Sequence, residues 1–308
     1  MPAASLITRL RKKSGNQVKI DSIFSKRKGS SGSISKKNEP STIPSRHAPL
    51  KIFSFQIPPI LPLNDFTVCN CIVELIQHMF EDANLTRESQ LMIANCPRVI
   101  VETQLAGVYH SDFTNVSREL EKEIQIGNVR RLYLHRSDSF SGESCLVLRS
   151  ELNEIYQLYL NKHKDNKELQ LLITKLREFL CTHGSTSYSS EELNLSLQER
   201  RTLTTAGFLT LDGTDSYGIS LPNLGVFTHI LHSSRKDLIQ FFKKKPFYEC
   251  IEASLLQRNI SVTARRKHET FFGWKFRLCD AIGAGLIDAF MTSCGRAYRL
   301  TRRGLEYK

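Results

Sequence analysis

Two glycines, Gly283 and Gly285, lie two residues apart in the stretch LCDAIGAGLIDAFMTSCGRAYRL, residues 278–300. A glycine-rich loop binds phosphate when it follows a strand and opens a helix, because the backbone N–H groups then converge on the anion. Here the order is reversed, since the pair follows an apolar run with helical spacing and precedes a strand-like one. Gly285 is therefore predicted to allow a left-handed turn from helix to strand, and Gly283 to let the helix end pack closely.

Histidine and cysteine side chains could bind a metal ion, but their spacing does not favour one. His229 and His232 are three residues apart on a predicted helix, and no third ligand is evident nearby. The eight cysteines include no C-x-x-C pair, and Cys69 and Cys71 are too close together for a usual zinc site. The sequence predicts no metal and no cofactor, and reduced cysteines that are mostly structural.

Phosphoryl transfer by a protein kinase would need a glycine-rich loop, a strand lysine, H-R-D and then D-F-G, in that order. The chain has two look-alikes, HRSD at residues 135–138 and DFT at residues 112–114. The D-F element precedes the H-R element, and no metal-binding asparagine follows at the right distance. The motifs therefore do not predict a kinase.

Charge is distributed unevenly along the 308 residues, whose formal net charge is +12. Residues 1–50 carry eleven Lys and Arg against two acids, residues 243–308 carry fourteen against six, and residues 51–242 carry eighteen against twenty-three. Two basic ends around an acidic middle favour separate contacts with a polyanion; a solvated tail and a solvated helix face are the alternative. No apolar run approaches the ~20 residues that a membrane span needs, so no membrane contact is predicted.

The first 50 residues are rich in Ser, Gly, Lys and Pro and poor in apolar side chains, so they are predicted to be a disordered basic tail. Two short basic clusters fit nuclear import signals or a phosphate-binding arm, and they consist of Arg11, Lys12, Lys13 and of Lys26, Arg27, Lys28. A nuclear location follows from this interpretation.

The tail also contains an approximation of the motif by which repair and replication proteins dock on the sliding clamp. Its residues are Gln17, Ile20, Ile23 and Phe24. The clamp motif ends in two aromatic residues, and Ile23 occupies one of those positions. The sliding clamp is thus a candidate partner on an incomplete motif.

Three glycines, Gly127, Gly207 and Gly285, each close a predicted helix and precede a strand, a polar turn and a second strand. Their spacings of 80 and 78 residues indicate a repeated domain of about 80 residues. Helices followed by a glycine-capped turn and a hairpin describe a winged helix. The predicted fold is a helix-rich α+β chain of three tandem winged-helix domains, at residues 51–150, 151–222 and 223–308, after the tail at 1–50.

Basic residues near helix ends and predicted hairpins are the candidate DNA contacts. They are Lys243, Lys244, Lys245, Arg258, Arg265, Arg266, Lys267, Arg296, Arg302 and Arg303 in the third domain, and Arg130 and Arg131 in the first. Arg265, Arg266 and Lys267 precede the predicted recognition helix of the third domain. Such side chains bind phosphates rather than bases, so DNA binding with low sequence selectivity is predicted.

The stretch FRLCDAIGAGLIDAFMTSCGRAYRLT, residues 276–301, resembles the serine/threonine-protein kinase 19 family, also called winged helix repair factor. The matching residues are chiefly Asp280, Ile282, Gly283, Ala284, Leu286, Asp288, Ser293, Gly295, Arg299 and Leu300. Weaker similarity extends back to residue 53. This chain has Phe276 and Arg277 where the family is expected to have Tyr and His.

This resemblance implies three tandem winged helices, DNA binding, and a part in transcription-coupled nucleotide excision repair with stalled RNA polymerase II and its repair factors. Together with the motifs, it predicts a nuclear, non-enzymatic DNA-binding scaffold. An atypical serine/threonine kinase is the alternative. A protein-docking adaptor without direct DNA contact is a third class, and it fits the acidic middle of the chain.

Overall fold

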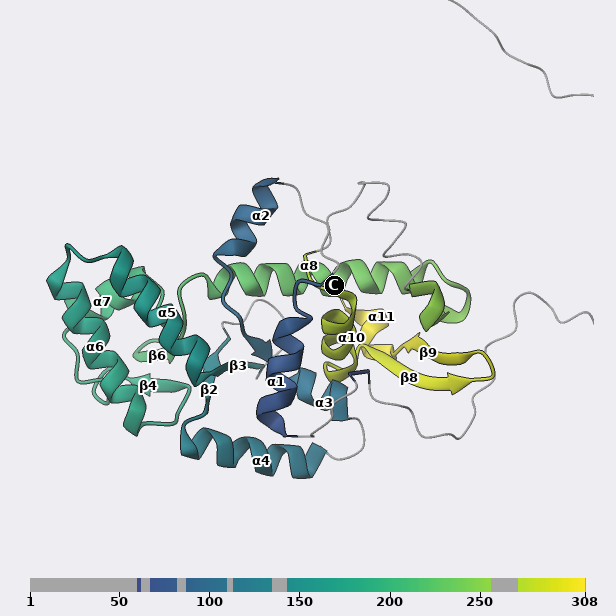
Figure 1. The fold of residues 1–308 in the computed structure, drawn as a ribbon, viewed down its shortest axis with the longest axis horizontal. Helices are drawn as coiled ribbons and strands as arrows, with labels where there is room; N and C mark the ends of the chain where they lie inside the picture. The colour runs from purple at the N-terminus through teal and green to yellow at the C-terminus, as the bar shows by residue number, and fades with distance from the viewer. Residues whose placement is uncertain are drawn as a thin grey trace, which may run out of the picture. The chain divides into compact units, whose positions relative to one another are not determined.

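A computed structural model describes residues 60–61, 67–81, 87–109, 113–134, 143–255 and 271–307. The chain divides into two units, 1–45 and 46–308, and every described residue belongs to the second. The described part is helix-rich α+β and contains three small antiparallel sheets of three strands each (Figure 1). The clamp-like motif, both basic clusters of the tail, Arg258, Arg265, Arg266 and Lys267 lie outside the described residues.

The first sheet has the strand order β1-β3-β2 and is built from the segment up to residue 148. Its elements are α1 (Val68–Gln77), α2 (Arg87–Ala94), β1 (Ile100–Val101), α3 (Thr103–Tyr109), α4 (Phe113–Ile126), β2 (Val129–Tyr133) and β3 (Ser144–Leu148). Helix α1 begins where the Thr67 hydroxyl accepts a hydrogen bond from the backbone N–H of Asn70, which satisfies one of the unpaired donors of the first turn.

The second sheet has the order β4-β6-β5. The elements of this segment are α5 (Arg149–Lys162), α6 (Lys167–Thr182), β4 (Ser187–Ser189), α7 (Leu197–Ala206), β5 (Leu209–Leu211) and β6 (Ser216–Ile219). Ser196 and Glu199 form a capping box at the start of α7, in which each side chain accepts the other's backbone N–H. This local signal sets where α7 begins.

The third sheet has the order β7-β9-β8. Its segment comprises α8 (Leu224–Lys243), the 3-10 turn η1 (Pro246–Tyr248), β7 (Glu249–Ile251), α10 (Trp274–Gly283), β8 (Ile287–Thr292), β9 (Gly295–Leu300) and α11 (Arg302–Glu306). Helix α8 is the longest helix in the part of the chain described, and its buried side chains recur every three or four residues along one face.

The same order of elements occurs three times: one or two helices, a short strand, at least one further helix, and a hairpin. In each case the short strand pairs antiparallel with the second strand of the hairpin. The three predicted hairpins are confirmed. The short strands were not predicted, because two or three residues are too few to show an alternating pattern.

The predicted helix-ending turns are also confirmed. Gly127, Gly207 and Gly285 have φ values of 83°, 87° and 67°, in the left-handed region that glycine adopts without steric cost. The Gly207 N–H donates to the carbonyls of Leu203 and Thr204, which would otherwise be unpaired at the end of α7. These glycines let a strand start directly after each helix.

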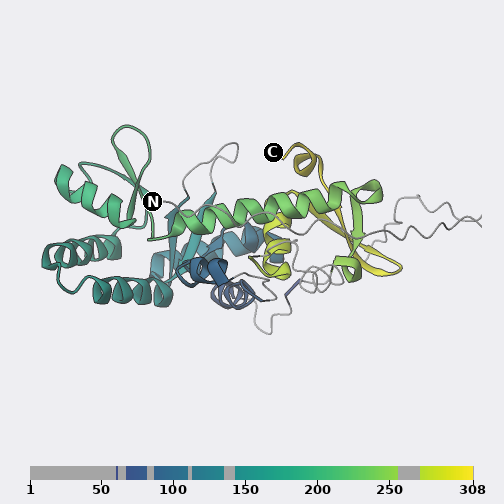
Figure 2. The ribbon, with the colours of Figure 1, turned by 90° about the horizontal axis from the view of Figure 1, so that it is seen from above.

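Helices α3 and α10 cross at very close range, which joins the first and third sheet segments. A Cβ atom added to Gly283 would overlap the Thr103 carbonyl oxygen, and one added to Gly107 would overlap the carbonyl of Cys279. Only glycine on both helices permits this approach. The prediction that Gly283 allows close packing is thereby confirmed, and α10 lies between α3 and α8 (Figures 1 and 2).

A buried ion pair fixes α10 on its other side. Two nitrogens of the Arg235 guanidinium on α8 each donate to the carboxylate of Asp280 on α10, at 2.7 Å. The third contacts Glu143, just before β3, at 3.1 Å. Burial alone would lower the pKa of Arg235, but the two carboxylates raise it above its ordinary value. One cation therefore ties α8, α10 and the first sheet together.

The glycine crossing gives a direct test. Replacing Gly283 with Ala places a methyl group against backbone that can yield only if α3 moves, so we expect the free energy of unfolding to fall by about 2 kcal/mol or more. Gly225→Ala is the matched control, because Gly225 also lies in a helix but has no atom near its added Cβ. That variant should gain up to about 1 kcal/mol. Equal effects in urea unfolding would contradict the packing described.

Candidate nucleic-acid interface

Helix α10 occupies the position of the predicted recognition helix in the third repeat, but none of its side chains is exposed. Phe276, Arg277, Leu278, Cys279, Asp280 and Ala281 are buried, and the remaining four are half-buried. Arg277 donates to the Ser234 carbonyl at 3.1 Å and pairs with Asp237 at 2.6 Å, so its charge is used inside the fold. A helix that enters a DNA groove needs a free face, so any contact by this repeat must come from its turns, helix ends and hairpin.

The equivalent helix of the first repeat, α4, uses its three glutamates in contacts inside the fold. Glu119 accepts the backbone N–H of Val68 at 2.9 Å, and Glu123 accepts the side-chain amide of Asn128 at 2.9 Å. Glu121 pairs with Arg131 at 2.7 Å. Arg118 and Lys122 are exposed on the same helix, so the charge that α4 presents to solvent is mixed and does not by itself favour a polyanion.

Arg130, one of the two predicted contacts in the first repeat, points into the protein. It donates to the backbone carbonyls of Leu180, His183 and Ser185, the last at 2.7 Å, and to the Tyr188 hydroxyl at 3.3 Å. These acceptors lie at the end of α6 and in the chain leading into β4. Arg130 therefore joins the first and second sheets, and we leave it out of the candidate interface.

Two further predicted arginines are also engaged by carboxylates. Arg131 is held by Glu102 at 2.9 Å and by Glu121, and the pKa of Arg131 is raised because these partners outweigh partial burial. Arg296 lies largely buried at the start of β9, 3.4 Å from Glu252. Their positions favour structural roles over phosphate binding.

The three consecutive lysines 243–245 lie at the C-terminal end of α8. Lys243 and Lys244 are exposed, and the Lys245 ammonium lies 5.0 Å from the centre of the Phe241 ring. Cations are favoured here even without a ligand, because the last carbonyls of a helix carry partial negative charge. Lys243 and Lys244 therefore present their charge to solvent, while Lys245 is half-buried beside Phe241.

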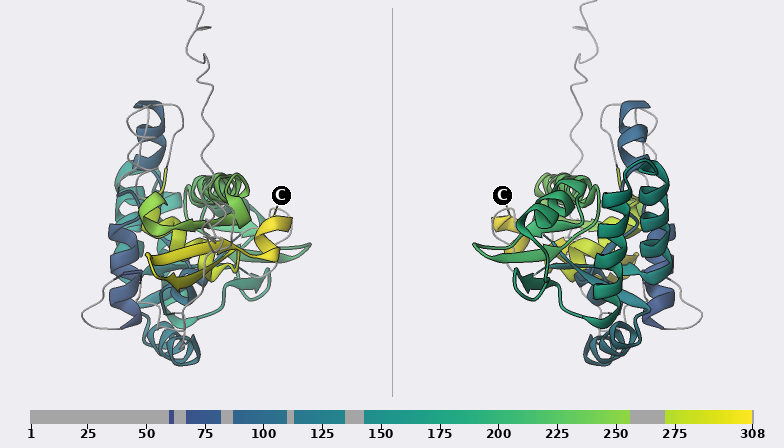
Figure 3. Two further views of the ribbon diagram at one scale, coloured as in Figure 1. Left: turned by 90° about the vertical axis from the view of Figure 1, so that its right-hand side faces the viewer. Right: turned by 90° about the vertical axis from the view of Figure 1, so that its left-hand side faces the viewer.

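Further arginines extend this charge along the third sheet. Glu249 pairs with Arg299 across β7 and β9; because the strands are antiparallel, the residues before Glu249 lie beside the segment that leads from Arg299 into α11. Arg302, on α11, is 91% exposed and makes a surface ion pair with Glu306. Arg299 also lies 3.8 Å from the Glu249 carboxylate, but 41% of its side chain is exposed, unlike that of Arg131 or Arg296. We call Lys243, Lys244, Lys245, Arg299, Arg302 and Arg303 the basic edge. The turn η1 that follows the three lysines contacts β9, which leads into α11, and the left view of Figure 3 shows this end of the molecule facing the viewer.

Two exposed aromatic residues, Phe247 and Tyr248, lie within the basic edge. Both have positive φ, 55° and 57°, which is rare for bulky side chains. Sequence reasoning missed this pair and Arg299. The adjacent run of three lysines indicated a basic surface near the two aromatic residues. The positive φ of these residues could not be predicted from the sequence, because Phe and Tyr normally avoid that conformation.

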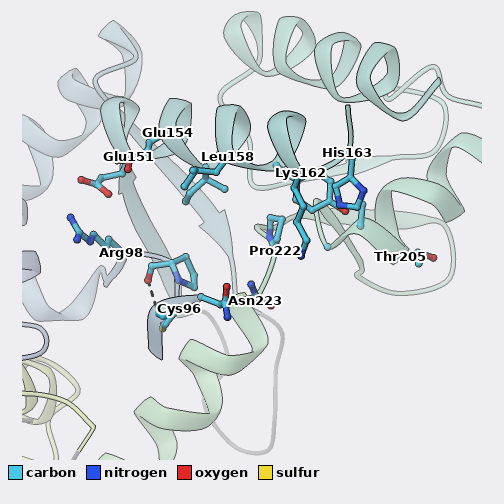
Figure 4. Close-up of a pocket in the computed structure, with 17 residues that line it drawn as sticks. Cys96, Arg98, Glu151, Glu154, Leu158, Lys162, His163, Thr205, Pro222 and Asn223 are labelled. Atoms are coloured by element: carbon cyan, nitrogen blue, oxygen red, sulfur yellow. Dashed lines mark hydrogen bonds between the residues drawn. The ribbon is translucent and has the colours of Figure 1, made fainter. Parts of the chain in front are cut away.

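A hollow of about 660 Å³ lies between α5, the end of α7 and the start of α8 (Figure 4). Charges of both signs line it: Arg98 and Lys162 on one hand, Glu151 and Glu154 on the other. Leu158 projects over it from α5, as the figure shows. Because its charges are mixed, this surface does not favour a polyanion.

The histidine and cysteine positions agree with packing roles. His232 is hydrogen-bonded through Nδ1 to the Tyr307 hydroxyl at 2.7 Å, whereas His229 is exposed. All eight cysteines are free, and five of them are buried; burial raises the pKa of Cys96 to about 12. In the described ranges no three His, Cys, Asp or Glu side chains group as metal ligands, and no helix is long and apolar enough to cross a membrane.

Most residues of the kinase look-alikes fall outside the described part of the chain. Residues 135–138 and Asp112 lie outside the part of the chain that the structure describes. Thr114, the last residue of the DFT match, lies in the first turn of α4.

Comparison with known proteins places these features in a family. The family model "Stk19: Inactive serine-threonine protein kinase 19" matches residues 76–300. A Schizosaccharomyces pombe protein named "Serine/threonine-protein kinase mug51" is 51% identical over 308 residues, which is the full length of both chains.

More distant relatives carry a different name. "Winged helix repair factor 1" of Homo sapiens is 23% identical over 209 residues, covering 66% of this chain and 77% of the relative. The Xenopus laevis protein of the same name is 28% identical over 137 residues, covering 42% of this chain and half of that protein.

The position of Arg130 predicts a large stability effect. Arg130→Ala leaves several buried carbonyls without a donor, so we expect the free energy of unfolding to fall by about 3 kcal/mol. Arg302→Ala removes an exposed arginine whose ion pair with Glu306 lies on the surface, and it should change the free energy of unfolding by less than about 0.5 kcal/mol. Urea unfolding of both variants checks this contrast, and an Arg130→Ala protein as stable as the parent would refute the assigned role.

Proposed function

The chain belongs to the Stk19 family, and from this premise we propose that it is a nuclear DNA-binding protein of three tandem winged-helix domains. In this proposal the protein is a scaffold in transcription-coupled nucleotide excision repair and acts with stalled RNA polymerase II and its repair factors. The domains are residues 51–150, 151–222 and 223–308. The basic edge is the surface that binds DNA.

The repeated order of elements supports the winged-helix assignment. One or two helices, a short strand, at least one further helix and a hairpin recur three times, and the short strand each time completes a three-stranded sheet with the hairpin. This is the helix-turn-helix unit with an added β wing. The human and Xenopus relatives, named "Winged helix repair factor 1", support this interpretation.

The observation that carries DNA binding is the basic edge itself. Lys243 and Lys244 are exposed at a helix end, and Arg302 is almost fully exposed a short distance away. Side chains placed in this way hold phosphates without reading bases. In the same proposal the positive charge is increased by four residues that lie between described residues 255 and 271: Arg258, Arg265, Arg266 and Lys267.

The repair role and the partners are proposed from the relatives. Both distant relatives are named as repair factors, so repair proteins and RNA polymerase II are the partners to test first. The basic clusters of the tail support nuclear import, and its incomplete motif makes the sliding clamp a second partner to test.

A kinase is the second candidate, because the relative that matches the whole chain is named one. The family description, however, names an inactive kinase. A protein-docking adaptor is the remaining candidate, and it fits the acidic excess of residues 51–242. Metal-dependent phosphate transfer that is lost on changing one acidic residue would establish the kinase instead.

Alanine replacement of Lys243, Lys244 and Lys245 tests the proposed interface. Each lysine that neutralises a phosphate releases a counterion, so the logarithmic salt slope of duplex binding should decrease by up to about 3, with weaker binding at ~50 mM salt for unrelated DNA sequences. Stability should hardly change, because exposed charges contribute little to folding.

Alanine replacement of Lys162, Lys164 and Lys167 is the matched control. These three lysines are exposed, and replacing them removes the same charge from the second repeat. It should retain the parent salt slope. A larger loss in this control than in the first variant would move the interface to the second repeat. No DNA affinity of the parent at ~50 mM salt would refute DNA binding and favour the adaptor.

A further inference from the structure

The turn from α8 to β7 holds two aromatic residues in a conformation that their side chains disfavour. Lys245 is extended, as a residue before proline usually is, and Pro246 starts the one-turn helix η1. The next two residues, Phe247 and Tyr248, are both left-handed. The Tyr248 N–H donates to the Lys245 carbonyl at 3.1 Å, which closes the turn, and Glu249 begins β7.

The fold itself gives no reason to have aromatic residues at these two positions. Glycine or asparagine would adopt positive φ with less strain. Burial of the side chains does not offset this strain, because Phe247 is 45% exposed and Tyr248 is 43% exposed. They are the only exposed members among the Phe, Tyr and Trp side chains whose burial the structure describes. Strain combined with exposure points to a role outside the fold.

Charge around the two rings identifies the kind of partner. Lys243 and Lys244 precede them, and the chain entering α11, with Arg302, runs beside them. An apolar protein surface covering the rings would have to desolvate these cations, whereas a nucleic acid would neutralise them. Cations that follow a phosphate backbone, beside flat rings that accept base faces, are how single strands are bound without sequence preference.

We propose that Phe247 and Tyr248 stack on unpaired bases of single-stranded DNA while the basic edge holds its phosphates. This inference rests on the proposed DNA binding and adds a strand preference to it. In a duplex the faces of the bases are covered by their neighbours, so the rings find partners only where the strands are separated. The expected site is therefore a junction or an open stretch of DNA rather than an intact duplex.

Two double variants separate stacking from apolar contact. Phe247→Leu with Tyr248→Leu keeps apolar bulk and the same backbone demand but removes both rings. Phe247→Tyr with Tyr248→Phe keeps both rings. Each is compared with the parent by fluorescence anisotropy on a 12-nucleotide oligo(dT) and on a 12-base-pair duplex, at the same salt concentration.

For the leucine variant we expect single-strand affinity to fall at least about fivefold per ring lost, with a change below twofold on the duplex. The variant that keeps both rings should stay within twofold of the parent on both DNAs. Leu158→Asn, at an exposed apolar residue near the hollow of the second repeat, serves as a surface control and should also stay within twofold.

The outcomes distinguish this inference from the function it rests on. Parent protein that binds neither DNA refutes both. Parent protein that binds duplex, with a leucine variant unchanged on the single strand, refutes only the stacking. An equal loss of affinity for the single strand and the duplex would also overturn the stacking, because the rings would then contact DNA without binding unpaired bases. A protein partner for the rings would then be the better explanation.

Discussion

The buried pair of Arg235 with Asp280 and Glu143 is the interaction on which the arrangement of this protein depends. A guanidinium inside a protein costs several kcal/mol of desolvation unless its partners are fixed, so α8, α10 and the start of β3 must be held in register. On the opposite side of α10 the contact with α3 allows only Gly107 and Gly283. Together these constraints make α10 the centre of a core that the first and third repeats share.

This central position limits where the proposed DNA binding could occur. A helix that is covered on both sides cannot also enter a groove, so in the proposal the third repeat uses α10 as core and its helix ends and turns as the contact surface. The turn η1 after α8 packs against β9, and β9 leads into α11. The same logic explains why Arg130, although it lies in a hairpin strand, serves the contact between the first and second repeats.

Several features could be predicted from the sequence because they have local causes. The glycines after α4, α7 and α10 mark turns that only a residue free to adopt positive φ makes easily, and their spacing gave the repeat. The family follows from the C-terminal stretch around Asp280 and Leu300. The burial of α10 could not be predicted, because it depends on residues 103–107, far away in the chain. Strand β7 and the strained turn before it could not be predicted either. A strand of three residues shows no alternating pattern, and Phe and Tyr normally avoid positive φ.

Amide hydrogen exchange with and without DNA tests the central claim most directly. If α10 is core and the basic edge is the interface, saturating DNA should slow exchange of the amides of residues 243–249 and 299–304, while those of α10 keep their rates. Protection that appeared along α4 or α7 and left residues 243–249 unchanged would contradict the account, because DNA would then lie on a helix face of the first or second repeat.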